Sequence, residues 1–200
     1  MRQRTRRPAS AGRPGYVYLT RWPRRALNPA GRTPLLVTEG GAAIPESGAI
    51  LLCLAEGMPL LPDDRVERAH VHAWMFFEQN LLEPNVGTAR FWRLTGRDAK
   101  GERRSLAISW PAQARSQRSN AASPGRTSSS GGRYTVADCA LYAYTRVAHE
   151  AGYEVAAYPA VVAWLGRVAA TPGAIDDLEP YPAAAYAGAG GRSAYDLRAG

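Results

Sequence analysis

Residues 28–56, NPAGRTPLLVTEGGAAIPESGAILLCLAE, contain the pattern that decides the fold. The apolar run Leu35–Thr38 follows Pro34 and precedes a turn signal at Glu39–Gly41, which predicts a hairpin with a second short strand. Beyond the hairpin, apolar residues recur at helical spacing, so a helix is expected with Ser47 as its N-cap. The stretch therefore predicts a β-hairpin followed directly by a helix.

The start of this helix is a candidate binding site for a zwitterion. Unpaired N–H groups at a helix N-terminus attract a carboxylate, and Glu46, next to Ser47, can take an ammonium group. Together they would suit the amino-acid end of a γ-glutamyl peptide. The alternative is an ordinary capped helix with a solvated glutamate, and the spacing alone does not decide between the two.

The order NPxGxxPxL, glycine-rich hairpin, ESxAIxxxLA resembles the second half of the thioredoxin-like domain of cytosolic, bacterial-type glutathione transferases. The resemblance implies a cis peptide bond before Pro34 and backbone hydrogen bonds from Thr33 to the cysteinyl part of glutathione. It also implies that Glu46 and Ser47 hold the γ-glutamyl end and that Arg32 approaches the glycyl end. Thr33 stands where valine is usual in the family.

Two later stretches predict further helices. Residues 134–152, YTVADCALYAYTRVAHEAG, begin with a capping-box pattern at Thr135 and Asp138, and residues 158–173 read YPAVVAWLGRVAATPG. Both resemble helices of the all-α domain of the same family. The fold class implied is α+β, mostly α, with a partial thioredoxin-like βα unit followed by an all-α C-terminal domain.

A long helix is predicted after Asp64, with an end or a kink at Pro84. The residues expected on its apolar face are Val66, Ala69, Ala73, Phe76, Phe77 and Leu81. Four aromatic residues near this helix could pack in the core or line an apolar substrate pocket, namely Trp74, Phe77, Phe91 and Trp92.

The expected organisation has four regions: a basic arm at 1–27, the glutathione-binding portion at 28–58, the helical domain at 59–182 and a flexible tail at 183–200. An irregular insert, 103–132, interrupts the helical domain and is rich in Ser, Arg, Gly and Pro. The arm has the composition of a transit peptide or a disordered segment. For both the arm and the insert, a natural disordered segment and translation out of the ancestral reading frame remain open explanations.

The net charge of +8 comes from 25 Lys and Arg residues against 17 Asp and Glu residues. The excess lies in residues 1–38 and 99–133, where no aromatic residues alternate with the charges, so a nucleic-acid partner is not expected. No apolar run reaches 18 residues and no secretory signal is recognised, so we expect a cytoplasmic protein without a membrane segment. Cys53 and Cys139 lie in apolar helical patterns, which favours free thiols.

The resemblance implies a glutathione transferase, in which the glutathione thiolate attacks an electrophilic carbon of an apolar substrate. The implied partners are glutathione as co-substrate, a small electrophile and a second copy in a homodimer, with no metal. A complete thioredoxin-like domain needs a βαβ unit of about 30 residues or more before Pro34, and no catalytic Ser, Cys or Tyr can be matched there. The alternative is a non-catalytic, glutathione-transferase-like interaction module.

Overall fold

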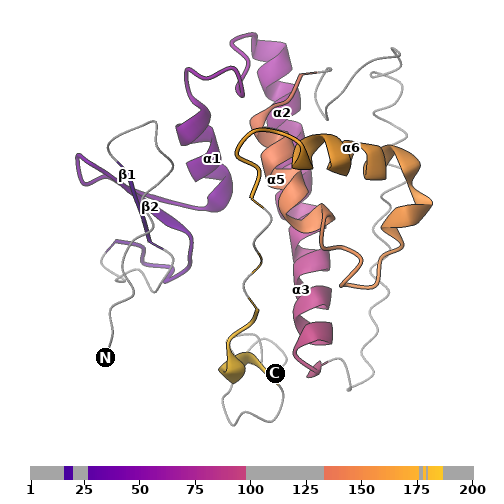
Figure 1. Ribbon diagram of the computed structural model, residues 1–200. Coiled ribbons are helices and arrows are strands. Elements are labelled where there is room, and N and C mark those ends of the chain that lie inside the picture. Colours follow the sequence, from indigo (N-terminus) through magenta and orange to yellow (C-terminus); the bar gives the residue numbers. More distant parts are fainter. Residues whose placement is uncertain (1–15, 20–26, 98–132, 176–177, 179, 187–200) are drawn as a thin grey trace. The chain divides into compact units, whose positions relative to one another are not determined.

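The computed structural model describes residues 16–19, 27–97, 133–175, 178 and 180–186. The chain divides into two compact units, Met1–Leu61 and Pro62–Gly200. The first contains a small sheet and one helix, and the second is helical (Figure 1). The predicted α+β, mostly α class is confirmed. Most of the predicted basic arm, the whole insert 103–132 and residues 187–200 of the predicted tail lie outside the described residues.

The sheet of the first unit has the strand order β1-β2-β3, and both neighbouring pairs are antiparallel. β1 spans Tyr16–Leu19, β2 spans Leu35–Thr38 and β3 spans Ala43–Pro45. The N–H of Thr38 donates to the carbonyl of Ala42 at 2.9 Å and so closes the turn between β2 and β3. The predicted hairpin is therefore confirmed.

Helix α1 spans Ser47–Ala55 and packs on the hairpin. The buried apolar residues of this unit include Leu35, Leu36, Ile50 and Ala55. The predicted helix is confirmed, but the prediction that Ser47 is its N-cap is wrong. The N–H of Ile50 donates to the carbonyl of Glu46 at 3.0 Å, so Glu46 is the N-cap and Ser47 the first helical residue. The reason is that Glu46, at φ 70°, turns the chain from β3 directly into the helix.

A long helical rod opens the second unit. It consists of α2 (Arg65–Phe77), the π-helical turn η1 (Glu78–Leu82) and α3 (Glu83–Leu94). Asp64 caps it, because its Oδ1 accepts hydrogen bonds from the N–H groups of Val66 and Glu67, each at 2.9 Å. Pro84 lies in the first turn of α3. The predicted break thus takes the form of a π-helical turn, after which the helix continues to Leu94.

The apolar face predicted for this rod is mostly exposed, so that prediction is wrong for most of its members. Phe76 is 65% exposed, Val66 58% and Leu81 44%. The buried apolar side chains of the rod are instead Val71, Met75, Phe77, Leu82, Val86 and Phe91. The helix carries apolar residues on two sides, and periodicity alone does not say which side packs against the next helix.

Helix α5 spans Val136–Thr145 and lies beside the rod, and α6 spans Pro159–Ala169 and packs on α5 (Figure 1). The core between them includes Phe77, Leu82, Val86, Leu141, Ala148 and Ala151. α5 ends before the predicted Gly152. The Thr145 hydroxyl donates to the carbonyl of Leu141 at 2.6 Å, a local bond that competes with regular helix, and residues 146–151 form successive turns.

Two short 3₁₀ helices complete the second unit, η3 (Val155–Ala157) before α6 and η4 (Ala183–Ala185) near the end of the described chain. The Arg97 guanidinium donates to the carbonyl of Ala185 at 3.0 Å, which attaches η4 to the end of the rod. No helix in the described part of the chain is long and apolar enough to cross a lipid bilayer.

Candidate functional site

The register of the hairpin brings four of the predicted site residues to one end of the sheet. Leu35, the first residue of β2, pairs with Pro45, the last residue of β3. In an antiparallel pair the residue before one strand lies next to the residue after the other. Thr33 and Pro34 therefore enter the sheet at the end where Glu46 and Ser47 leave it.

The loop that leads into β2 is held by Asn28. Its side-chain amide donates to the carbonyl of Arg32 at 2.7 Å, and its Oδ1 accepts from the N–H of Ala30 at 3.1 Å. Asn28 is buried, and these bonds fix the backbone just before the Thr33–Pro34 peptide bond, which is cis as the resemblance implies. In the sequence, Asn28 stands out only as the first residue of the NPxGxxPxL order. Its role in holding Arg32 depends on a side chain folding back over four residues.

The candidate site residues are accessible to a ligand. Arg32, Thr33 and Glu46 are exposed, and Pro34 and Ser47 are half-buried. The side chain of Glu46 makes no capping hydrogen bond to its own helix. The first N–H groups of α1 therefore remain available to an external anion, and the carboxylate of Glu46 remains available to a cation. This arrangement can bind a zwitterionic group.

Neither a thiol-activating group nor a metal site is assigned among the described residues. No Ser, Cys or Tyr before Pro34 can be matched to a catalytic residue, so no thiol-activating group is assigned. Within the described ranges no group of three or more His, Cys, Asp or Glu side chains could hold a metal ion. The described residues thus offer groups that can bind a ligand, and no catalytic role is assigned to any of them.

The aromatic residues considered as a pocket lining make packing contacts. Trp74 meets Phe77 edge to face, with ring centroids 5.7 Å apart, and Phe91 meets Tyr181 in the same way at 5.3 Å. Phe77 and Phe91 are buried. These contacts assign the three side chains to the interior of the helical unit, which was the more ordinary of the two interpretations.

Comparisons with known proteins identify similar chains and bear on the fold. No family model matches the sequence. The solved structure of a glutathione S-transferase from Xanthobacter autotrophicus Py2 is 40% identical, with a TM-score of 0.67, and the match covers 78% of this chain and 76% of that one. The chain belongs to the glutathione S-transferase family. The family fold implied by the hairpin and the two later helical patterns is thereby established.

Proteins with a different description are also similar to this chain. The transcriptional regulator Ure2 of Saccharomyces cerevisiae is 38% identical over 77 residues, which are 34% of this chain. The matched region spans 22% of the length of that relative. A structure of Ure2p in complex with glutathione has a TM-score of 0.58 at 26% identity, covering 74% of this chain and 76% of that chain.

Proposed function

We propose that the protein binds glutathione at the end of the hairpin and conjugates its thiolate to electrophilic apolar substrates. The observation that carries the proposal is the pairing of Leu35 with Pro45, which joins the entry to β2 with the start of α1. Membership of the glutathione S-transferase family and the likeness to a glutathione complex support the same ligand.

Each candidate residue has a proposed contact. The γ-glutamyl carboxylate meets the N–H groups of the first turn of α1 and the Ser47 hydroxyl, since a helix N-terminus stabilises an anion. The γ-glutamyl ammonium pairs with Glu46, and the glycyl carboxylate pairs with Arg32. The backbone at Thr33, ahead of Pro34, meets the cysteinyl unit. Both ends of the peptide are then held by charge, and the thiol lies between them.

In the proposed reaction the thiol of glutathione releases its proton to water, and the thiolate sulfur forms a bond to an electrophilic carbon. The leaving group departs from that carbon with the electron pair of the broken bond. The residues named above bind and orient glutathione, which raises the effective concentration of the nucleophile. A group that lowers the pKa of the glutathione thiol would complete the site. We also propose that the protein is cytoplasmic, because its co-substrate is the reduced form of glutathione.

The second candidate function is a non-catalytic, glutathione-transferase-like interaction module. It is favoured by the likeness to a transcriptional regulator and by the lack of an assigned thiol-activating residue. In this version the site binds glutathione without turnover, and the helical unit contacts a protein partner.

We further propose a homodimer, by analogy with the family. The exposed apolar side chains of the rod, Phe76 and Val66 among them, offer a surface for a second copy. Light scattering of the purified protein should give twice the mass of one chain, and Phe76→Ser should shift the population towards the monomer. A monomer at micromolar concentration would contradict this assembly.

Calorimetric titration with reduced glutathione tests the binding site. Glu46→Gln and Ser47→Ala should each weaken binding about tenfold, as expected for the loss of a charge-assisted hydrogen bond. Glu39→Gln is the matched control, because Glu39 is an exposed glutamate in the turn at the opposite end of the same hairpin. The affinity of Glu39→Gln for glutathione should equal that of the unchanged protein.

Turnover with an electrophilic chloronitrobenzene, followed by absorbance of the thioether product, separates the two functions. Binding with turnover supports the transferase, and binding without turnover supports the interaction module. A folded protein that does not bind glutathione, or one in which Glu39→Gln weakens binding as much as Glu46→Gln, overturns the proposed site.

A further inference from the structure

The helical unit contains a cavity of about 130 Å³ that the glutathione site does not use. Its floor is formed by three buried side chains from the rod, the end of α5 and the turn that follows, namely Val86, Thr145 and Ala148. Its walls are formed by the half-buried Tyr153, Val155 and Val161. The cavity therefore deepens from a partly exposed wall to the core of the unit.

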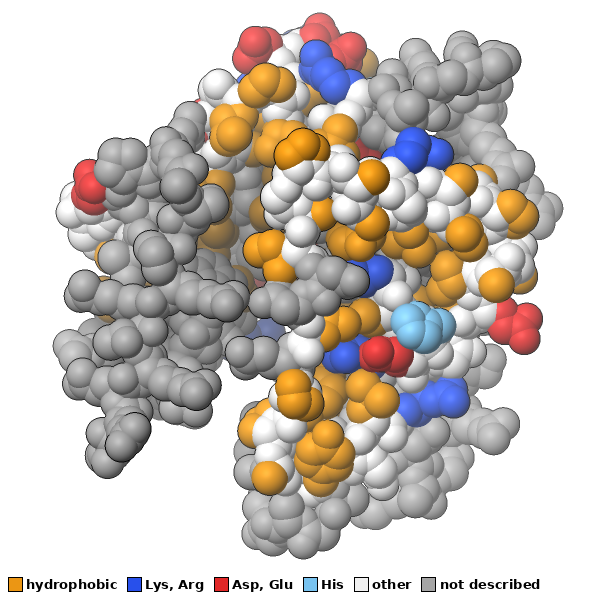
Figure 2. Space-filling model, in the orientation of Figure 1, with side chains coloured by type: hydrophobic (Ala, Val, Ile, Leu, Met, Phe, Trp, Pro, Cys, Tyr) orange, Lys and Arg blue, Asp and Glu red, His pale blue; other side chains and the backbone are white. Residues whose placement is uncertain are grey.

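The cavity exists because of how the chain passes from α5 to α6. α5 stops at Thr145, and the chain turns back at Gly152, which has a φ of +90° that glycine adopts without strain. It then passes through η3 and begins α6 at Pro159. Figure 2 shows hydrophobic side chains over α6 and the segment before it on this face. The cavity lies between this connection and Val86 of the rod.

The volume and the lining favour an apolar ligand over water. An enclosed apolar cavity of roughly 150 Å³ holds benzene or xenon, and this pocket, which is open at an exposed rim, has a volume of about 130 Å³. A buried water needs about two to four polar partners. The floor offers one polar side chain, Thr145, whose hydroxyl already donates to the carbonyl of Leu141 at 2.6 Å. A single aromatic ring fits these conditions better than ordered water.

The rim determines which polar group such a ligand can carry. Glu154 and Tyr158 are exposed at the rim, and Glu154 is the charged residue in the lining. Burial raises the pKa of Tyr153, so this wall stays uncharged at neutral pH. A carboxylate on the ligand would be repelled by Glu154, whereas an ammonium or hydroxyl group could face it.

We propose that this cavity is a second ligand site, which takes a benzene-sized aromatic molecule bearing a neutral or cationic polar group. The ring lies on Val86 and Ala148, and the polar group faces Glu154 at the rim. All of the lining residues belong to the second unit. The site therefore does not depend on glutathione, and its ligand should bind equally well with and without glutathione present.

Binding is tested with three probes of one shape: toluene, benzylamine and benzoate. Ligand-detected NMR with the full chain should show saturable binding of toluene and benzylamine, and benzoate should bind at least tenfold more weakly. Glu154→Gln should reduce the difference between benzylamine and benzoate without abolishing toluene binding, because it removes the charge at the rim and keeps the apolar floor.

Two adjacent valines provide a matched pair of variants. Val161→Phe adds a ring at a residue that lines the cavity, and Val162→Phe adds the same ring at the next position, which is 48% exposed and does not line it. Toluene affinity should fall tenfold or more in the first variant and stay unchanged in the second. If Val161→Phe does not fold, Ala157→Trp at the exposed rim tests the same entrance.

Three results would overturn the proposal. The first is a folded protein that binds neither toluene nor benzylamine. The second is equal loss of toluene affinity in Val161→Phe and Val162→Phe. The third is competition between toluene and glutathione, which would place the probe in the glutathione site. Failure of the proposed glutathione site would leave the toluene measurements unaffected, so the two proposals fail separately.

Discussion

The indole Nε1 of Trp164 donates a hydrogen bond to Oδ1 of Asp138 at 2.9 Å and so joins α6 to the first turn of α5. The other carboxylate oxygen, Oδ2, accepts from the N–H and the hydroxyl of Thr135, at 2.8 and 3.1 Å. Asp138 is fully buried. One carboxylate thus caps a core helix and also positions its neighbour, and the sequence had indicated only the first of these roles.

Replacing Asp138 by Ala should therefore destabilise the helical unit strongly. The change removes the capping acceptor and leaves the indole N–H of Trp164 without its partner, at a combined cost of about 3 kcal/mol. Trp164→Phe removes one hydrogen bond and keeps the cap, so its cost should be smaller, about 1–2 kcal/mol. Urea unfolding of both variants measures the difference. Equal losses would contradict the dual role of the carboxylate.

Glu78 should make stability depend on pH near neutrality. Burial raises the pKa of its carboxyl group from 4.5 to about 7, with repulsion from Glu83 adding to the rise and the hydrogen bond from Gln79 opposing it. Between these two values the folded protein keeps a proton that the unfolded chain has released. The free energy of unfolding therefore falls as the pH rises from about 4.5 to about 7.

Glu78→Gln should remove this dependence. The variant should be more stable than the unchanged protein above pH 7, by up to about 3 kcal/mol, and about equally stable near pH 4.5. Urea unfolding at several pH values measures the difference curve. Glu67→Gln, which changes an exposed carboxylate on α2, is the control and should leave the curve flat. A flat curve for Glu78→Gln as well would show that the buried carboxyl titrates normally.

Two glycines should respond to alanine in opposite directions. Gly152 has a φ of +90°, and a Cβ there would lie 1.8 Å from the Arg93 guanidinium, so Gly152→Ala should cost about 1–2 kcal/mol. Gly166 lies inside α6 with no atom within 4 Å of such a Cβ, so Gly166→Ala should stabilise the protein by about 0.5–1 kcal/mol. Thermal unfolding of both variants checks the signs, and two shifts in the same direction would refute this account.

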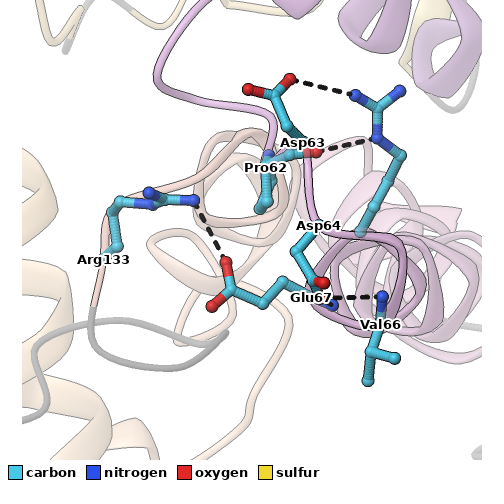
Figure 3. Close-up of polar contacts among 7 residues, drawn as sticks. Pro62, Asp63, Asp64, Val66, Glu67 and Arg133 are labelled. Carbon is cyan, nitrogen blue, oxygen red and sulfur yellow. Dashed lines mark hydrogen bonds and ion pairs between the residues drawn. The ribbon is translucent and has the colours of Figure 1, made fainter.

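Two arginine ion pairs of the helical unit, Arg90–Glu150 and Arg133–Glu67, should differ in strength. Arg90 is paired with Glu150, and its guanidinium donates to the Tyr181 hydroxyl at 3.1 Å and lies over that ring. Arg133 pairs with Glu67 at 3.3 Å (Figure 3), but both side chains are more than half exposed. Arg90→Ala should cost about 1–3 kcal/mol, and Arg133→Ala less than about 0.5 kcal/mol.

Hydrogen exchange adds a local measure of the same difference. Arg90 and Tyr181 join α3 to the end of the described chain. The backbone amides within residues 180–186 should therefore exchange faster in Arg90→Ala, and their exchange rates should not change in Arg133→Ala. Faster exchange in both variants, or in neither, would mean that Arg90 does not hold this segment.

The hairpin, α1 and α6 could be predicted because each is determined by local signals: the glycine turn after Thr38, the helical spacing after Ser47 and the Pro159 start. The apolar face of the rod could not, because Phe76 and Met75 have similar apolar character, and only the position of α5 decides which of them is buried. The end of α5 was missed because the local pattern of residues 146–151 does not distinguish the successive turns found there from a continued helix.

The candidate site was likewise predictable from the sequence only in part. The residue types at Arg32, Thr33, Pro34, Glu46 and Ser47 were readable from the motif. The meeting of Thr33 and Pro34 with Glu46 and Ser47 at one end of the sheet follows from the pairing of Leu35 with Pro45, which is a property of the register. The support from Asn28 and the cavity above Val86 depend on backbone paths that no local pattern encodes.

The backbone of Glu46 sets stability and recognition against each other at one position. With φ at 70° it occupies a region that disfavours residues with a Cβ by roughly 1 kcal/mol or more, and glycine would relieve that strain. Under the proposed function, however, glycine would also remove the carboxylate that faces the ligand. If positions for stabilising mutations were ranked by backbone strain alone, Glu46 would be selected early. The resulting protein would be more stable but would no longer bind its ligand.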